Sequence, residues 1–306
     1  MDKEITQNKQ VVVIVNPNSG ISSKRRVVSK IISYVNTERY DLTICYTSFP
    51  GHATKIACEA VDKGVAIVVA VGGDGTVNEV AKALVWSNTA LGIVPCGSGN
   101  GLARHLGIPL NVRKAIEVIN RGNTDTIDTM EVNGDSCFCT AGVGYEAYVG
   151  AEYAKEKRRG LITYARKAIS GWLRYEPQEY ILEVGDQVLI RKALSITCAN
   201  ANQWGNGFHI APKASLKDGF FDVTITYPFG IVNAIAMPSQ ILGYSFDKNP
   251  KVESFKAKQL VIKRRRTNNL LHIDGETLCM EDDLIVNICE DSLKVICDPV
   301  SGVRNR

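Results

Sequence analysis

Short apolar runs alternate with amphipathic stretches over the first 127 residues of the chain. Runs such as Val11–Val15 and Ala66–Val71 contain no polar residue, which is typical of strands that are buried on both faces of a parallel sheet. The stretches between the runs have apolar residues at helical spacing. This alternation predicts an α/β fold, with a mostly parallel sheet and helices on both of its faces.

The expected elements of this first part can be placed along the chain. Strands are predicted at Val11–Val15, Asp41–Thr47, Ala66–Val71 and Leu91–Val94. Helices are predicted at Lys24–Val35, Ala53–Lys63, Thr76–Trp86 and Leu102–Leu106. Thr76 and Glu79 also have the spacing of a capping box, which would make Thr76 the N-cap residue of its helix.

After Asp128 the pattern changes to strand-like segments separated by turns rich in Gly, Asp and Asn, which predicts a β-rich antiparallel sandwich domain. The expected strands are Thr129–Val132, Cys137–Ala141, Tyr180–Val184, Val188–Leu194, Ser195–Ala199, Phe221–Tyr227, Gln259–Arg264, Leu270–Ile273 and Leu284–Ile288. Helical patterns interrupt them near Tyr145–Tyr175 and Gly230–Leu242. We therefore expect a first domain of residues 1–127, allowing for its completion by about 295–306, and a second domain of residues 128–294.

Three of the predicted strands end in loops of small residues: Asn16–Gly20, Gly72–Thr76 and Pro95–Gly101. In a parallel sheet all three loops lie at the carboxyl edge, where ligands bind. Glycine allows a phosphate to approach the backbone, and the helix that follows directs free N–H groups at the anion. One such loop is an ordinary chain reversal, but three loops at one edge suggest a nucleotide site. A P-loop and a GxGxxG fingerprint are both missing.

The composition is that of a globular protein, with 45% hydrophobic and 22% charged residues. No stretch reaches the ~18 unbroken apolar residues of a membrane-spanning helix. The first apolar run is too short for a signal-peptide core. We expect a cytoplasmic protein, with any membrane contact peripheral and at the inner face.

The nine cysteines and four histidines of the chain show no metal-ligand spacing. Cys137 and Cys139 would share one face of a predicted strand, but no second pair completes a zinc site. A protein-bound transition metal is therefore not expected.

The net charge of +4 is unevenly distributed, with basic segments at Glu152–Arg174 and Lys256–Arg266. The first segment predicts an amphipathic helix with Leu161, Ile169 and Trp172 on its apolar face. Such a helix either lies on an anionic membrane or packs on its own domain with a solvated basic side. The second segment lacks interleaved aromatic residues, so nucleic-acid binding is not expected.

Five segments resemble the motifs of a known family when taken in chain order. Three lie in the first domain: Asn16–Gly20, Gly72–Glu79 (GGDGTVNE) and Pro95–Pro109 (PCGSGNGLARHLGIP). Two lie in the second: Pro212–Val223 (PKASLKDGFFDV) and His272–Glu276 (HIDGE). Together they resemble the diacylglycerol kinase catalytic-domain family, which includes bacterial lipid kinases, eukaryotic diacylglycerol kinases, and ceramide and sphingosine kinases. GGDGT alone also occurs in NAD kinases and phosphofructokinase-like enzymes, so a sheet of that kind is expected.

The resemblance implies an ATP- and Mg²⁺-dependent kinase that phosphorylates a lipid hydroxyl of the diacylglycerol or of the sphingoid or ceramide kind. It implies nucleotide contacts by Asn16, Pro17, Asn18, Ser19, Gly20, Thr47, Gly73, Asp74, Gly75, Thr76, Val77, Asn78, Glu79 and Ser98. Glu276 corresponds to the general base of the bacterial members, and Asp74 to an acid that sphingosine-kinase-like members use for deprotonation or metal binding. Phosphoryl transfer needs such acids to neutralise charge and to orient the attacking hydroxyl.

Bacterial members hold Mg²⁺ at the loop around Asp218-Gly219. Carried over, Asp218 would ligate through its carboxylate, and Ser215 and Phe220 through backbone carbonyls. From the residues alone, Asp218-Gly219 and Asp274-Gly275 are equally strong hairpin-turn signals. We also consider Asp128, at the end of the first domain, as a further member of the network of site acids that includes Asp74, Asp218 and Glu276.

The lipid itself is not fixed by the resemblance. Many bacterial members read Gly-Thr-x-Asn-Asp in the third loop, whereas this chain has Gly97-Ser98-Gly99-Asn100-Gly101, closer to the sphingosine-kinase branch. Two rival hypotheses stay open: an NAD kinase-like small-molecule kinase, and a degenerate protein that binds lipid or nucleotide without catalysis. Contact with a membrane surface and a homodimer are further expectations.

Overall fold

A computed structural model of the 306-residue chain describes residues 8–18, 24–156, 161–172, 174–230, 237, 239–264 and 269–298. Contacts between residues divide the chain into two compact units. The first contains residues up to Ile127 together with the segment that begins at Asp291, and the second contains Asp128–Glu290. Within the described ranges, no helix is long and apolar enough to cross a bilayer.

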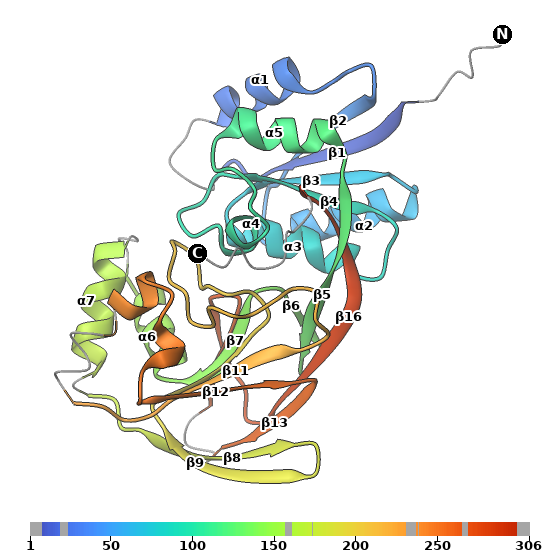
Figure 1. Ribbon diagram of the computed structural model, residues 1–306. Coiled ribbons are helices and arrows are strands. Elements are labelled where there is room, and N and C mark those ends of the chain that lie inside the picture. The colour runs from blue at the N-terminus through green and yellow to red at the C-terminus, as the bar shows by residue number, and fades with distance from the viewer. Residues whose placement is uncertain are drawn as a thin grey trace. The chain divides into compact units, whose positions relative to one another are not determined.

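The first unit is built on four parallel strands in the order β2-β1-β3-β4. The strands are β1 (Lys9–Val15), β2 (Tyr40–Tyr46), β3 (Ile67–Gly72) and β4 (Ala90–Pro95). The helices are α1 (Lys24–Tyr34), α2 (His52–Asp62), α3 (Asp74–Leu84), α4 (Gly101–His105) and α5 (Val112–Arg121). Helices α1 and α5 lie on one side of the sheet, and α2 and α3 lie on the other (Figure 1). The predicted α/β architecture is confirmed.

Two local predictions in this unit need correction. Helix α3 begins at Asp74 with Gly73 as its N-cap residue, so Thr76 lies inside the helix and the predicted capping box is wrong. Helix α5 was not predicted, although its ends carry clear signals. The Asn111 side chain accepts the Lys114 N–H at 3.2 Å, and Gly122 at the C-cap has a positive φ.

The second unit contains a six-stranded antiparallel sheet in the order β12-β11-β10-β7-β14-β15. Its strands are β7 (Thr140–Gly144), β10 (Ser195–Ala199), β11 (Phe221–Thr226), β12 (Val252–Ala257), β14 (Leu270–Ile273) and β15 (Glu276–Cys279). The other strands of the unit are β6 (Asp135–Cys137), β8 (Gln178–Val184), β9 (Gln187–Ala193) and β13 (Gln259–Lys263). Fully buried residues of both sets of strands, such as Leu182, Ile196, Val223 and Leu260, form one apolar core, so the antiparallel sandwich is confirmed.

Several predicted elements of the second unit differ in detail. The strand predicted at Cys137–Ala141 is two strands, because β6 ends at Cys137 and β7 begins at Thr140; Cys137 and Cys139 therefore share no strand face. The helix predicted over Glu152–Arg174 is also two elements, α6 (Tyr145–Ala154) and α7 (Leu161–Trp172), and Lys155 and Glu156 lie outside both. Strands β12 and β15 were not predicted. The helix predicted near Gly230–Leu242 lies mostly outside the described residues.

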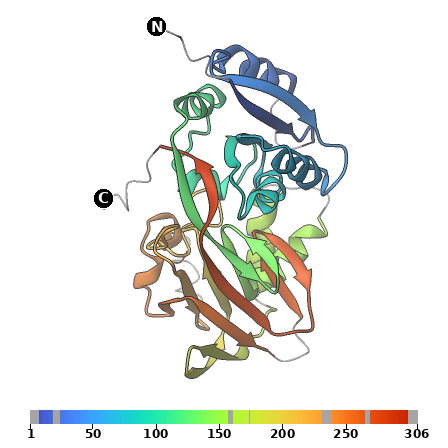
Figure 2. The same cartoon turned by 90° about the vertical axis from the view of Figure 1, so that its right-hand side faces the viewer.

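Two long strands contain residues of both units. Strand β5 (Thr124–Val132) extends from the first unit into the second, and β16 (Leu284–Ile296) extends from the second into the first. The two strands pair with each other, as Figure 2 shows in green and red. Near its end β16 pairs in parallel with β4, with Val295 opposite Leu91, so the end of the chain supplies a strand to the sheet of the first unit.

Candidate functional site

The carboxyl ends of the four parallel strands of the first unit lie side by side. In the register of the sheet, Val15 is opposite both Tyr46 and Val71, and Gly72 is opposite Pro95. The residues that follow these strands therefore leave the sheet at one edge. They include the three predicted glycine-rich loops and Thr47, whose N–H donates to the Val15 carbonyl at 3.0 Å.

The first loop contacts the second through side chains. Nδ2 of Asn16 donates to Oγ1 of Thr76 at 3.1 Å, and the Asn16 Oδ1 accepts the N–H of Asn18 at 2.9 Å. Pro17 and Asn18 form a turn directly after β1. Ser19 and Gly20 lie outside the described residues, so their predicted nucleotide contacts stay predictions.

The second and third loops pack backbone against backbone. A Cβ atom added at Gly97 would lie 2.6 Å from the Gly73 Cα, and one added at Gly99 would lie 2.6 Å from the Asp74 Oδ2. At Gly97 the obstacle is backbone, so a side chain there would require a loop to move. At Gly99 the obstacle is the end of the Asp74 side chain, which would have to leave its present position. The glycines on either side of Ser98 therefore suit the close packing of the two loops.

Asp74 fastens these two loops together. Its Oδ2 accepts the N–H of Asn100 at 2.8 Å, and its Oδ1 accepts the N–H of Gly101 at 2.6 Å. Asn100 is the N-cap residue of α4, so the Asp74 carboxylate satisfies amides that the helix leaves without an acceptor. Each oxygen keeps a further lone pair, so these bonds leave the carboxylate free to accept more donors.

Gly75 differs from the other loop glycines because no contact requires it. A Cβ atom at this position would meet nothing within 4 Å, and the residue is exposed in the first turn of α3. Glycine inside a helix costs roughly 0.5–1 kcal/mol relative to alanine. The open space lies beside the first amides of α3, which have no acceptor within the helix and carry the positive end of its dipole.

Two residues of the second loop serve the fold of the unit. The Val77 side chain is buried, and Oε2 of Glu79 accepts the N–H of Ala53 at 3.1 Å in the first turn of α2. Helix α2 has Gly51 as N-cap residue without a side-chain cap, so Glu79 supplies the missing acceptor. Asn78, between these residues, is half-buried.

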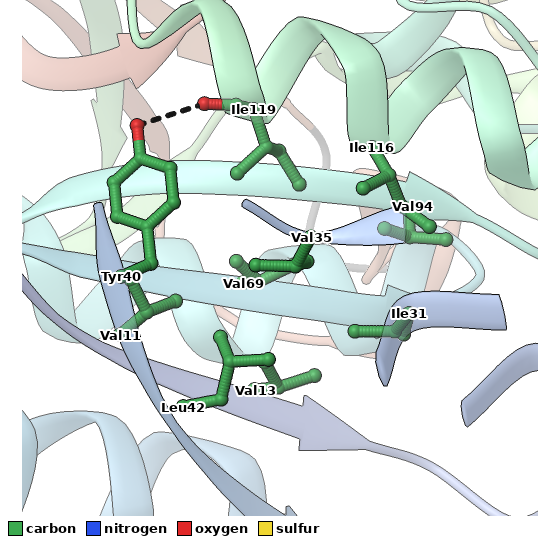
Figure 3. Close-up of a pocket in the computed structure, with 10 residues that line it drawn as sticks. All are labelled: Val11, Val13, Ile31, Val35, Tyr40, Leu42, Val69, Val94, Ile116 and Ile119. Carbon is green, nitrogen blue, oxygen red and sulfur yellow. Dashed lines mark hydrogen bonds between the residues drawn. The ribbon is translucent and has the colours of Figure 1, made fainter. Parts of the chain in front are cut away.

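A small apolar gap lies beneath α1 and α5, away from these loops (Figure 3). Its space of about 10 Å³ has room for at most one water molecule. Its lining has one polar group, the Tyr40 hydroxyl, which donates to the Ile119 carbonyl at 3.0 Å. The residues that line it are Val11, Val13, Ile31, Val35, Tyr40, Leu42, Val69, Val94, Ile116 and Ile119. This gap is a packing defect of the core and is too small for a substrate.

In the second unit, the predicted metal loop is closed by protein groups. Nζ of Lys256 lies 2.5 Å from Oδ2 of Asp218 and 3.2 Å from Oδ2 of Asp222. Oδ1 of Asp218 accepts the N–H of Phe220 at 3.2 Å, and Oγ of Ser215 accepts the N–H of Lys217 at 3.3 Å. This donor set fits a divalent cation poorly, because an ammonium group already neutralises the Asp218 carboxylate.

Asp128 makes two hydrogen bonds to the backbone of the same loop, at Leu216 and Gly219. Its Oδ2 accepts the N–H of Gly219 at 2.8 Å, and its own N–H donates to the Leu216 carbonyl at 2.7 Å. Asp128 is buried, and Gly219 has a φ of 69°, a conformation that favours glycine. Asp128 therefore acts in this acidic network by fixing the turn.

The HIDGE segment contains a half-buried acid, Asp274, and an exposed one, Glu276. Asp274 accepts three consecutive backbone N–H groups, from Phe138 at 2.9 Å, Cys139 at 2.7 Å and Thr140 at 3.1 Å. Glu276, after the turn, is exposed, and its carboxylate bonds to none of the described residues. Asp274 thus fixes the turn, and Glu276 is available to a ligand.

A buried polar group beneath this segment was not predicted. Oε1 of Glu146 accepts the Thr197 hydroxyl at 2.6 Å, and its Oε2 lies 3.1 Å from the His272 Nε2. Thr197 and His272 are both opposite Gly142 in the sheet register, and a Cβ atom at Gly142 would lie 3.1 Å from the His272 Nε2. Residues so far apart in sequence give no local signal, because only the strand register brings them together.

Among the described residues of the predicted amphipathic helix, Lys155, Arg166 and Lys167 are each paired with an acid. Nζ of Lys167 lies 2.9 Å from Glu156 and 3.8 Å from Glu152, and Arg166 lies 3.3 Å from Glu156. Ile169 is 70% exposed, whereas the Trp172 ring stacks on Phe229. The four residues Arg158, Arg159, Lys157 and Leu173 lie outside the described residues.

Two family models match this chain, one over the part with alternating strands and helices and one over the β-rich part. Residues 10–132 match the diacylglycerol kinase catalytic domain. Residues 139–297 match the YegS C-terminal NAD kinase beta sandwich-like domain.

Curated relatives cover most of the chain. An uncharacterized protein of Synechocystis is 29% identical over 90% of this chain and 64% of its own length. The diacylglycerol kinase of Bacillus subtilis is 26% identical over 88% of this chain and 90% of its own. The probable lipid kinase YegS of Escherichia fergusonii is 31% identical over 68% of this chain and 72% of its own.

Solved structures share the fold. A putative diacylglycerol kinase from Bacillus anthracis superposes with a TM-score of 0.77 at 22% identity, covering 96% of this chain and 99% of the other. An NAD kinase from Archaeoglobus fulgidus in complex with ATP superposes with a TM-score of 0.52 at 9% identity, covering 95% of this chain and 94% of the other. The expectation of an NAD-kinase-like sheet is confirmed at the level of the fold.

Proposed function

The chain belongs to the diacylglycerol kinase catalytic-domain family, and from this premise we propose that it is a kinase that transfers the γ-phosphoryl group of ATP to a hydroxyl group of a lipid. The lipid is of the diacylglycerol kind or of the sphingoid or ceramide kind. Mg²⁺ enters as part of the MgATP co-substrate.

The observation that carries the proposal is the meeting of three loops at one edge of the parallel sheet. Asn16 contacts Thr76, and Asp74 contacts Asn100 and Gly101, so the loops form one connected surface. At that surface the first amides of α3 have no acceptor within the helix, and a Cβ at Gly75 would meet nothing within 4 Å. Backbone N–H groups at the start of a helix bind phosphate groups through hydrogen bonds and the helix dipole.

The residues with proposed nucleotide contacts fall into two groups: those that lie at the sheet edge and those that support the helices around it. Gly73, Asp74, Gly75 and Thr76 present backbone amides, and Asn16, Pro17, Asn18, Thr47 and Ser98 lie at the same edge. Val77 and Glu79 support the helices around the loop, so we propose that they act on the nucleotide only through the loop's shape. Asn78 keeps its proposed contact with the nucleotide.

For the chemical step we propose Glu276 as general base. The lipid hydroxyl gives its proton to the Glu276 carboxylate while its oxygen bonds to the γ-phosphorus. The bond between that phosphorus and the β–γ bridging oxygen breaks, and ADP leaves. The exposure of Glu276 and the firm anchoring of Asp274 two residues earlier support this role.

We further propose that the protein meets its lipid by peripheral contact with a membrane surface. The exposed Ile169 on α7 supports this, since an aliphatic side chain in water gains by insertion among lipids. Sedimentation with vesicles of phosphatidylglycerol should retain the protein, and Ile169→Asp should reduce the retained fraction several-fold. Equal retention of both proteins would remove α7 from this role.

The phosphate site is tested by Gly75→Ala. The variant should fold at least as stably as the wild type, because alanine favours the helix and meets no neighbour. We expect its KM for MgATP to rise by at least about tenfold, since a 1.4 kcal/mol loss of binding corresponds to that factor. Lys82→Ala, in the last turn of the same helix, is the control. An unchanged KM in Gly75→Ala would contradict a phosphate at this turn.

The acceptor is tested by transfer of labelled phosphate from ATP to a panel of diacylglycerol, sphingoid base, ceramide, phosphatidylglycerol and NAD. Labelled lipid supports the proposal, and labelled NAD would establish the NAD kinase-like alternative. Binding of lipid and ATP without any transfer would establish the non-catalytic alternative.

A further inference from the structure

We infer that the Lys256 ammonium group is the resident cation of the loop Ser215–Phe220, so that this loop is held closed without a bound divalent metal ion. The inference departs from the Mg²⁺ site that the family resemblance implies for Ser215, Asp218 and Phe220. It does not depend on the proposed reaction, because it concerns the folded protein without nucleotide.

The sheet fixes the position of Lys256. It lies on β12 directly opposite Asp222 on β11, and residues paired across antiparallel strands project from the same face. Its ammonium group therefore lies 2.5 Å from the Asp218 carboxylate of the loop and 3.2 Å from the Asp222 carboxylate of β11. The lysine belongs to the sheet, so the cation is present whenever the fold is.

The loop requires a positive charge at this point. The Asp222 side chain is almost fully buried, and its carboxylate lies 3.2 Å from the Lys256 ammonium group. Two carboxylates beside each other, one of them buried, are unfavourable unless a cation lies between them. Lys256 bonds to both and supplies that charge.

Two backbone N–H groups of the loop are also satisfied by acids of the protein. Asp218 accepts the Phe220 N–H, and Asp128 accepts the Gly219 N–H. A divalent ion at Asp218 would have to share its carboxylate with the ammonium group, and the two cations would repel each other. An entering metal must therefore displace Lys256 from Asp218.

The neighbouring lysine provides a matched comparison. Nζ of Lys258 lies 2.6 Å from the Glu290 carboxylate and 5.2 Å from the centre of the Phe220 ring. Lys258 thus borders the same loop with the same charge, but its ion-pair partner lies outside the pair of aspartates. Substituting it removes a lysine without removing the cation from Asp218 and Asp222.

The experiment measures thermal unfolding of the chelated protein without nucleotide, in EDTA and then in millimolar Mg²⁺ or Mn²⁺. The wild type should unfold at the same temperature in all three solutions. Lys256→Met should unfold about 3–6 °C lower in EDTA, which is the shift expected for a loss of one to two charge-assisted hydrogen bonds. Divalent ions should restore part of that loss. Lys258→Met should lose about 1 °C at most, with no response to metal.

Two results would overturn the inference. One is a wild type whose unfolding temperature rises by several degrees in Mg²⁺, with the rise lost in Asp218→Asn, because the loop would then hold a metal of its own. The other is Lys256→Met with wild-type stability in EDTA. If Lys256→Met does not fold, Mn²⁺ binding to the nucleotide-free wild type, followed by electron paramagnetic resonance, decides the matter: Mn²⁺ bound through Asp218 contradicts the inference, and its absence supports it.

Discussion

Asp74 accepts hydrogen bonds from two backbone N–H groups of a neighbouring loop, although its motif suggests an acid that faces a nucleotide or a metal. The two roles are compatible, since a carboxylate has about four lone-pair sites and these bonds use two. The loop that carries Asn100 and Gly101 depends on Asp74 for its place. A substitution here therefore changes both the fold of the loops and any chemistry at them.

Asp74→Asn should lower stability as well as activity. One carboxylate oxygen becomes an NH₂ group that faces a backbone N–H, so about 1–3 kcal/mol of unfolding free energy should be lost. Activity with saturating MgATP should fall severely, and more than the fraction of unfolded protein explains. Urea unfolding together with steady-state kinetics measures both. Asp62→Asn, at the exposed end of α2, is the control. Full activity of the folded fraction would show that Asp74 only fastens the loops.

Glu276→Gln should reduce kcat by roughly 10²–10⁴-fold, the usual worth of a general base, and leave MgATP binding intact. The unfolding temperature should stay unchanged because this exposed side chain makes no bond to the described residues. Asp274→Asn provides the contrast and should lower stability, since one of the two oxygens that accept three backbone N–H groups becomes an NH₂ group. Turnover near that of the wild type in Glu276→Gln would remove the residue from the proposed role.

At the scale of elements, an ion pair joins β9 to β12 in the second unit. Arg191 binds the Glu253 carboxylate through two nitrogens, at 2.9 and 3.1 Å, and the Tyr227 hydroxyl donates to the same carboxylate. Bidentate pairs of this kind are the strong ones. The hydrogen bonds from Arg191 hold the pKa of Glu253 below its usual value of 4.5.

This pair predicts a pH-dependent contribution to stability. The folded pKa of Glu253 is lower than the unfolded value of 4.5, so the contribution is fully present above that value and is lost as the pH falls through the folded pKa. Glu253→Gln should cost about 1–2 kcal/mol at neutral pH, discounted because the pair is partly exposed. The difference from the wild type should shrink below pH 4.5. Urea unfolding along a pH series measures it, and a constant difference would contradict the argument.

The elements that could be predicted from the sequence are those whose pattern is local. Buried runs such as Val11–Val15 and Ala66–Val71 need no partner to be recognised, and the loops that follow them were placed at one sheet edge from the parallel order alone. Strand β15 could not be predicted because it has only four residues, two exposed and two half-exposed, with no apolar alternation. Helix α5 has local signals at both ends, Asn111 at its N-cap and Gly122 at its C-cap, so it is predictable from the sequence.

The parts of the site that could not be predicted depend on register between distant strands. Lys256 meets Asp222 only because β12 pairs with β11, and Glu146 meets His272 only through the order of the sheet. Glu79 follows the capping-box spacing, yet its carboxylate accepts the Ala53 N–H of α2, and α3 has no side-chain cap of its own. Roles of this kind follow from tertiary contacts, which a single sequence does not display.

At the scale of the whole molecule, the first unit is completed by the last strand. The Trp86 N–H donates to the Ser292 carbonyl at 2.7 Å, and Arg121 binds Asp298 through two nitrogens at 2.7 and 2.8 Å. The side chains of Leu293, Val295 and Ile296 are fully buried. A chain that ends before this segment leaves one edge of β4 without a partner.

Truncation after Glu290 should therefore unfold the first unit. Burial of three such side chains contributes about 5–9 kcal/mol, which is comparable to the whole stability of a typical domain. Hydrogen exchange should show loss of protection in β3 and β4, whose central residues are buried. Truncation after Asp298 keeps every contact named above and is the control. Full protection of β4 in the shorter chain would show that the last strand is dispensable.

The late arrival of β16 has a consequence for biosynthesis. Residues 24–127 are synthesised long before residues 291–296. One edge of β4 therefore has no partner strand while residues 128–290 of the second unit are being made. During that interval the nascent chain presents a parallel sheet that lacks one strand, and such edges associate readily with other chains. The unit whose translation begins first therefore becomes complete only after residues 291–296 have been made.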